Sequence, residues 1–123
     1  FSIQLDNGTE LMLYRLRQKD GQSSKFSAGT FVGADGKNIH LGRDEFRLQP
    51  GRRWKDYPVT WDLEVASLGI RLQAAPKLDE QELLSPSKLT PSYWEGAMTF
   101  TGSHRGHGYL EMTGYDTALR FLR

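Results

Sequence analysis

Hydrophobic and polar residues alternate with a period of two along most of the chain, which is the pattern of half-buried β-strands. The clearest run is 57–65, where Tyr57, Trp61 and the other odd positions are apolar and face one side. Pro58, near the start of this run, cannot donate a ladder hydrogen bond, which predicts an edge or strand-entry position there. The pattern indicates a β-protein with one buried and one solvated sheet face.

Turn signals divide the alternation into eight to ten short strands with almost no helix. Asp6-Asn7-Gly8 is typical of a tight hairpin turn, and the stretch 102–106 predicts a second turn between two C-terminal strands. The connections are short enough for an up-and-down order, so the sequence predicts an all-β fold, an antiparallel lipocalin-like β-barrel. The expected strands are 1–5, 10–18, 26–32, 38–41, 46–49, 57–65, 70–74, 94–101 and 108–115, with 118–122 either adding a last strand or packing down.

Residues 76–91 interrupt this rhythm with three prolines, several charges and the pair Leu83-Leu84. The composition predicts a long loop, with one helical turn over 79–83. Loops of this length in compact domains often cover a site, although a plain connection between distant strands gives the same composition.

Length, charge and composition limit the possible functions. The 123 residues predict a single domain over 1–123, and the net charge of +1 gives no field that would attract nucleic acid. There is no cysteine for disulfides or thiolate chemistry. No apolar run approaches a transmembrane span, and no signal peptide is visible. Because the chain starts inside a strand at Phe1, we expect it to be one domain of a longer protein.

The strand at 108–115 gathers candidate chemistry on one face. Tyr109, Glu111, Thr113 and Tyr115 alternate with Leu110 and the other core-type positions. In a wide barrel the polar face lines a pocket, where Tyr109 and Glu111 are candidate catalytic residues as proton donor and base. The alternative is a carboxylate that pairs with an arginine across the sheet.

Aromatic residues suggest a binding surface. Trp94 and Glu95 must lie on opposite faces of their strand, so one of them is in the core. Inward aromatic rings either fill the core or line an apolar cavity. The candidate ligand-binding residues are Trp94, Tyr93, Trp61, Glu95 and Tyr115.

Motifs for metals and cofactors are lacking. His104 and His107 share a glycine-rich turn, but a zinc site needs further ligands at suitable spacing, so exposed turn histidines are the preferred interpretation and no metal is predicted. No nucleophile elbow or phosphate-binding glycine loop is present, and no cofactor is predicted.

Several separate stretches resemble one protein family. The segments 93–97 and 108–115 are similar to the C-terminal signature of the AttH-like, carotenoid 1,2-hydratase-related family. The family's second domain is matched, in order, by the segments 4–17, 27–30, 57–61 and 81–83.

The resemblance implies the C-terminal lipocalin-like domain of a longer two-domain protein. Such proteins are bacterial, often exported or periplasmic, and labelled predicted secreted hydrolases or hydroxyneurosporene synthase-like proteins. The implied partners are an upstream lipocalin-like domain and an apolar small molecule, of carotenoid, isoprenoid or lipid type. Two functions remain open. The domain binds or processes this molecule, with Tyr109 and Glu111 as acid and base of a hydratase, lyase or hydrolase, or it serves only as a packing domain.

Overall fold

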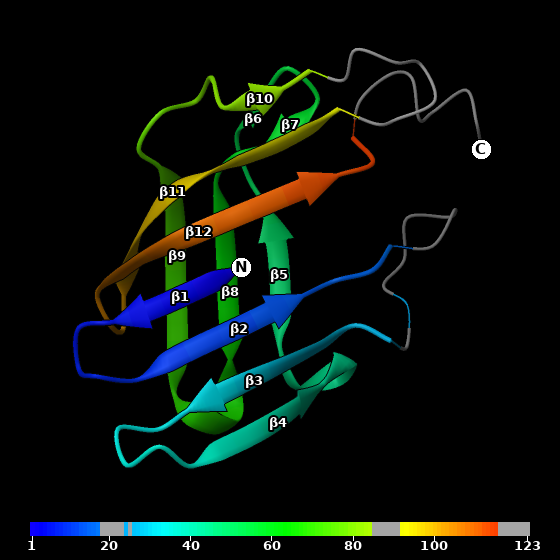
Figure 1. Cartoon of the computed structure of the whole chain (residues 1–123). Coiled ribbons are helices and arrows are strands. Elements are labelled where there is room, and N and C mark those ends of the chain that lie inside the picture. The colour runs from blue at the N-terminus through cyan, green and yellow to red at the C-terminus, as the bar shows by residue number, and fades with distance from the viewer. Residues whose placement is uncertain (18–23, 25, 85–91, 116–123) are drawn as a thin grey trace.

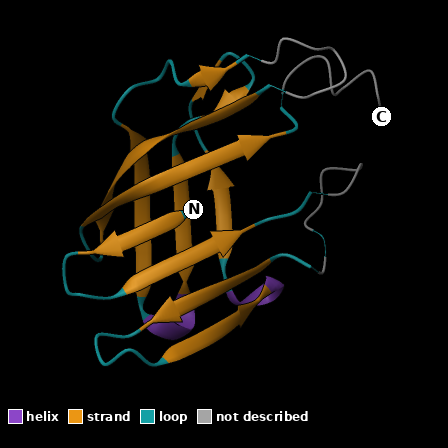
Figure 2. Ribbon diagram, in the orientation of Figure 1, coloured by secondary structure: helices purple, strands orange, loops and turns teal. Residues whose placement is uncertain are grey.

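A computed structural model describes residues 1–17, 24, 26–84 and 92–115 of the chain (Figure 1). The predicted strand at 118–122 lies outside these residues. Strands and their turns make up nearly all of the described chain, with only two short 3₁₀ turns, η1 (Arg43–Glu45) and η2 (Ala66–Leu68) (Figure 2). The strands are β1 (Ser2–Leu5), β2 (Glu10–Tyr14), β3 (Ala28–Val32), β4 (Asn38–Gly42), β5 (Arg47–Pro50), β6 (Arg53–Trp54), β7 (Tyr57–Pro58), β8 (Trp61–Val65), β9 (Ile70–Pro76), β10 (Glu82–Leu83), β11 (Tyr93–Gly102) and β12 (Gly106–Thr113).

One antiparallel sheet contains ten of the described strands. Its order is β4-β3-β2-β1-β12-β11-β9-β8-β5, with β10 paired to β11. The sheet curls so that β9, β8 and β5 cross behind the strands of the front layer (Figure 1). No pairing joins β4 to β5 among the described residues. The predicted all-β, antiparallel, lipocalin-like architecture is confirmed, in the form of a half-barrel with a seam between β4 and β5.

The first strand lies in the middle of this sheet. β1 pairs with β2 on one side and with β12 on the other, where Ser2 lies opposite Tyr109 and Leu5 opposite Gly106. A Cβ at Gly106 or Gly108 would overlap the carbonyl oxygen of Gln4 or Ser2. Glycine at these two positions therefore allows the close approach of β1 and β12 that joins the two ends of the chain.

Large apolar side chains fill the space between the layers. Inward positions alternate along every long strand as the sequence predicted, and the odd positions of 57–65 are all buried. The largest fully buried side chains are Trp94, Tyr57, Phe100, Ile3, Leu11, Leu13, Leu41, Leu63, Leu72, Met98, Val59 and Val65. Burial on this scale is the main favourable term for a domain of this size.

The expected continuous strand at 57–65 is divided in two. β7 pairs only with β6, in a separate two-stranded sheet, which agrees with the edge position predicted from Pro58. The amides of Val59 and Thr60 both donate to the carbonyl of Arg52, at 2.8 and 3.3 Å, instead of continuing the ladder. The chain therefore leaves one sheet and enters the other at Trp61.

The helical turn expected over 79–83 is wrong. Residues 82–83 form β10 instead, with Glu82 opposite Trp94 and Leu83 opposite Tyr93. β9 pairs with β11 only from Met98 onward, which leaves the earlier part of this edge of β11 without a partner strand. The segment after Lys77 occupies that edge, because an unpaired strand edge offers hydrogen bonds that outweigh a weak helical preference.

The close approach of β1 and β12 generates a prediction. We expect Gly108→Ala to destabilise the fold by about 1 to 3 kcal/mol, because the added methyl group meets the Ser2 carbonyl and forces the strands apart. Urea unfolding followed by circular dichroism measures the change. The matched control is His107→Ala, an exposed neighbour on the same strand, for which we expect less than about 0.5 kcal/mol. Equal stability of the two variants would contradict the prediction.

Candidate functional site

A cavity of about 580 Å³ lies along the seam of the half-barrel. Arg15 and Ser27 border it on the side of β2 and β3, and the segment 43–49 together with parts of β8 and β9 forms the opposite wall. Its apolar lining includes Phe46, Leu48, Leu63 and Leu72. The volume lies within the range of about 300 to 1,000 Å³ that is usual for small-molecule sites.

Arg15 extends the inner face of β2 into this cavity. Leu11 and Leu13 point inward, and the alternation places Arg15 on the same face. Its Nη1 donates to the carbonyl of Leu48 on β5 at 3.1 Å, and its guanidinium lies 5.6 Å from the ring centre of Trp61. The side chain thus spans the gap between the two layers and is partly buried there.

A second, smaller cavity of about 140 Å³ adjoins the first, and Arg15 and Leu48 line both. At its rim the guanidinium of Arg17 lies 3.7 Å from the ring centre of Tyr115 and donates to the carbonyl of Thr113 at 3.2 Å. This stacking over an aromatic face is worth about 0.5 to 2 kcal/mol. Both arginines are thus partly buried.

Three of the residues proposed from the sequence meet at the smaller cavity: Trp61, Glu111 and Tyr115 line it together. The indole of Trp61 is buried, donates to the carbonyl of Pro58 at 2.8 Å and packs edge-on against Phe1. Tyr115 is half-buried, with its ring 6.3 Å from that of Tyr57.

Trp94 is a core residue. It is 0% exposed, and its indole nitrogen donates to the carbonyl of Asp79 at 2.8 Å. Of the two arrangements considered from the sequence, Trp94 is therefore inside and Glu95 outside. Tyr93 and Glu95 lie half-buried on the outer face of β11, away from the seam cavity.

Tyr109 and Glu111 both lie on the outer face of β12 and are exposed. Glu111 lies directly opposite Glu95 on β11 and interacts electrostatically with the Phe1 amino group. Burial lowers the pKa of that amino group, and the negative charge of Glu111 offsets part of this effect. The acid–base role of Tyr109 and Glu111 stays a prediction, and neither residue lines the larger cavity.

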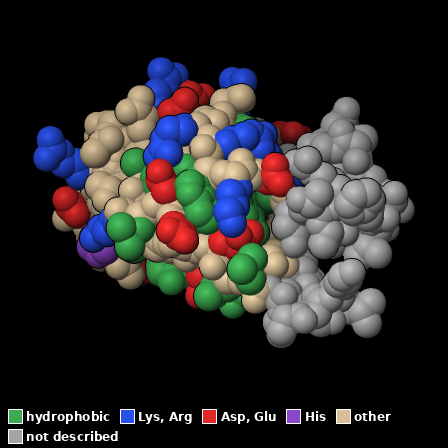
Figure 3. Space-filling model, turned by 90° about the horizontal axis from the view of Figure 1, so that it is seen from above, with side chains coloured by type: hydrophobic (Ala, Val, Ile, Leu, Met, Phe, Trp, Pro, Cys, Tyr) green, Lys and Arg blue, Asp and Glu red, His purple; other side chains and the backbone are tan. Residues whose placement is uncertain are grey.

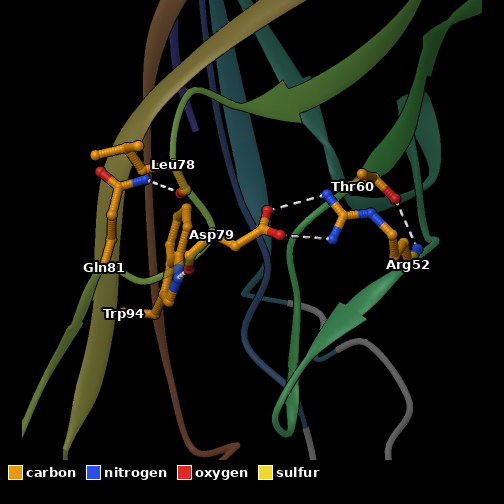
Figure 4. Close-up of polar contacts among 6 residues, drawn as sticks. All are labelled: Arg52, Thr60, Leu78, Asp79, Gln81 and Trp94. Carbon is orange, nitrogen blue, oxygen red and sulfur yellow. Dashed lines mark hydrogen bonds and ion pairs between the residues drawn. The ribbon is translucent and has the colours of Figure 1, made fainter.

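A group of polar contacts, the polar cap, involves Arg52, Thr60, Leu78, Asp79, Gln81 and Trp94 (Figure 4). Arg52 binds the carboxylate of Asp79 through two hydrogen bonds of 2.9 and 3.0 Å, while its amide donates to Thr60 Oγ1. In the same loop, the side-chain amide of Gln81 donates to the Leu78 carbonyl. The Asp79 carbonyl accepts the hydrogen bond from the Trp94 indole. Lys55 and Glu82 add a second ion pair of 3.0 Å. The cap joins the loop after β9 to the chain around β6.

Charges of the two signs are mixed on the face of the molecule that is seen from above. Seen from above, Lys and Arg side chains lie beside Asp and Glu side chains, with hydrophobic groups between them (Figure 3). This surface offers no broad basic patch of the kind that attracts nucleic acid. Within the described residues, no three His, Asp or Glu side chains gather closely enough to hold a metal ion.

Two features of the site were missed from the sequence. The cavity wall at 43–49 was expected only as a turn and a strand, and nothing in its composition indicated an unpaired seam. Arg15 carried a usable signal, because period-two alternation from Leu11 and Leu13 places it on the inner face.

The pairing of Arg52 with Asp79 gives a pH-dependent prediction. Hydrogen bonds from Arg52 lower the pKa of Asp79, and the same contact raises the pKa of Arg52. A carboxylate whose pKa is lowered in the folded state stabilises the fold above its unfolded pKa of about 3.9 and loses this contribution as the pH falls through the folded value.

We therefore expect Asp79→Asn to unfold at lower urea than the unchanged chain at pH 7, with the gap closing below about pH 4. Denaturation midpoints between pH 2.5 and 7 measure this. Glu80→Gln, an exposed neighbour in the same loop, is the control and should follow the unchanged chain throughout. A gap for Asp79→Asn that stays constant with pH would contradict the assignment.

Comparisons with known proteins agree with the fold and the strand order. The AttH-like family matches residues 1–115. A crystal structure from Nitrosomonas europaea, described as that of a candidate AttH, superposes with a TM-score of 0.82 at 33% identity, over 94% of this chain and 38% of the other. The chain thus spans about 38% of the length of that relative. No curated protein matches the chain.

None of the described residues forms a helix with the length and apolar character needed to cross a membrane. The family match covers every described strand, including those that border the seam cavity and those that carry the polar cap. The chain belongs to the AttH-like family.

Proposed function

We propose that this AttH-like domain binds a small apolar molecule in the seam cavity, between Arg15 and Ser27 on one side and the segment 43–49 on the other. The observation that carries the proposal is the cavity itself, about 580 Å³ beside an interior that is otherwise filled by large side chains. Phe46, Leu48 and Leu63 offer an apolar wall from which a ligand would displace water. Placement of the cavity at an unpaired seam gives a ligand access without opening the packed core.

We also propose that the domain is related to carotenoid 1,2-hydratases and that its ligand is of the same chemical type. An isoprenoid or lipid-like chain suits an apolar wall, and a catalysed reaction would further need an acid and a base at the ligand. Glu111 borders the smaller cavity, but Tyr109 lies only at the depression on the outer face, so the pair would act together only at a surface that another domain completes. Binding is therefore the function that the geometry of this chain supports best.

A neutral fluorescent probe tests the binding proposal. We expect N-phenyl-1-naphthylamine to bind the 123-residue chain saturably, with one site per chain and a rise in fluorescence. Leu48→Trp should weaken this binding by about tenfold, because the larger ring occupies the cavity, and tenfold corresponds to about 1.4 kcal/mol. Leu84→Trp, at a position that is 74% exposed and outside the cavity lining, is the control.

No saturable binding, or equal affinity in both variants, would overturn the proposal. Circular dichroism of each variant confirms that the fold is retained, so that a loss of binding by Leu48→Trp reports on the cavity.

A second candidate function is that of a packing domain, and the outer face of the sheet favours it. Met12, Tyr14 and Tyr109 are 57, 54 and 46% exposed, on the two strands β2 and β12 that flank β1. They border a shallow depression of about 370 Å³ together with Glu111. Exposed apolar side chains grouped in this way are typical of a surface that another domain covers.

We propose on this basis that the chain is the C-terminal half of a longer protein and that its outer face contacts an upstream domain. The relative from Nitrosomonas europaea supports the greater length, because this chain covers only 38% of it; the C-terminal placement is our proposal. Hydroxyl-radical footprinting of the whole protein beside the 123-residue chain tests it. We expect Met12 and Tyr109 to become protected in the whole protein, while the exposed Leu84 reacts equally in both. Equal labelling of Met12 and Tyr109 in the two samples would contradict the proposal.

A further inference from the structure

Arg15 is a partly buried cation for which the described residues supply no carboxylate. Its contacts are the Leu48 carbonyl at 3.1 Å and the face of Trp61 at 5.6 Å. Among the described residues none of the ion pairs includes it. Removing a charge from water is costly unless an opposite charge compensates, so a partly buried guanidinium that borders a cavity favours an anion there.

The charged side chains in the rest of the lining are of both signs, with more arginines than carboxylates. Arg15, Arg43, Arg47 and Arg71 line the larger cavity, against the carboxylates of Asp62 and Glu64. Glu64 is paired with Arg71 at 2.8 Å and Arg43 with Asp44 at 3.5 Å, which leaves Arg15 and Arg47 against Asp62. The remaining excess is positive, and a low-dielectric cleft concentrates the potential of such charges on a ligand.

We propose that the seam cavity recognises an amphipathic monocarboxylate, a molecule with an acidic head and a long apolar tail. The carboxylate accepts hydrogen bonds from Arg15, whose planar guanidinium keeps donors beyond the one used by Leu48. The tail lies along Phe46, Leu48 and Leu63. This inference rests on the proposed binding function and adds the chemical class of the ligand.

In this arrangement the acidic head and the apolar tail of such a molecule contact different parts of the cavity. Arg15 lies where the two cavities meet, and the apolar wall extends from there along β5 and β8. A neutral molecule of equal length gains the same apolar contacts but leaves the guanidinium without a counter-ion. The acid should therefore be preferred by the strength of one charge-assisted hydrogen-bonded pair.

Competition for the neutral probe measures this preference. At pH 8, dodecanoic acid should displace N-phenyl-1-naphthylamine from the 123-residue chain at a concentration at least about tenfold lower than 1-dodecanol requires. Arg15→Gln should abolish this difference, because it removes the positive charge that pairs with the carboxylate; the affinity of this variant for the neutral probe is measured beside it as the reference. Arg15→Lys should retain part of the preference, and Arg105→Gln, at an exposed turn, should retain all of it.

The outcomes separate this inference from the binding function on which it rests. If the probe binds but the acid and the alcohol displace it equally, the ligand class is wrong and the binding function stands. If Arg15→Gln still prefers dodecanoic acid to 1-dodecanol, the inference is also overturned, because another residue then binds the carboxylate. If the probe itself does not bind, both proposals fail. If Arg15→Gln does not fold, the comparison of acid with alcohol on the unchanged chain and on Arg15→Lys decides.

Discussion

The antiparallel pairing of β1 with β12 is the contact on which the rest of the structure depends. It joins the hairpins of β1 to β4 to the strands that follow, between residues more than a hundred positions apart, such as Ser2 and Tyr109. Closing so long a loop is entropically costly and slow, so the pairing must be favourable once made. Glycines at 106 and 108 make it possible, because a side chain there would overlap the backbone of β1.

The position of the cavity follows from this closure. β1 pairs with β2 and β12 in the middle of the sheet, so the two edge strands are β4 and β5. These strands are consecutive in the sequence but do not pair with each other. β5 carries Arg47, Gln49 and Pro50, which discourage pairing with another strand at such an edge. Large side chains fill the interior elsewhere, and the seam is where space adjoins the core.

Two surfaces of the same sheet thus have different chemistry. The inner face of β2 ends in Arg15, which crosses to β5 and gives the seam its charge, while the outer face presents Met12 and Tyr14. Alternation along one strand places the seam cavity and the apolar outer surface back to back. A domain built in this way can hold a ligand within itself and still offer a surface to a second domain.

The sequence by itself determined the β-class, the alternation of inward and outward residues, most strand positions and the family, because period-two patterning and turn residues act locally. It also placed Trp94 and Glu95 on opposite faces, without saying which was inside. Only the tertiary structure decided that Trp94 is core, that 57–65 is divided and that 82–83 pairs with β11. The seam, and Arg15 at its border, depend on which strand edges remain unpaired. That is set by contacts between residues far apart in the chain, on which local patterning carries no information.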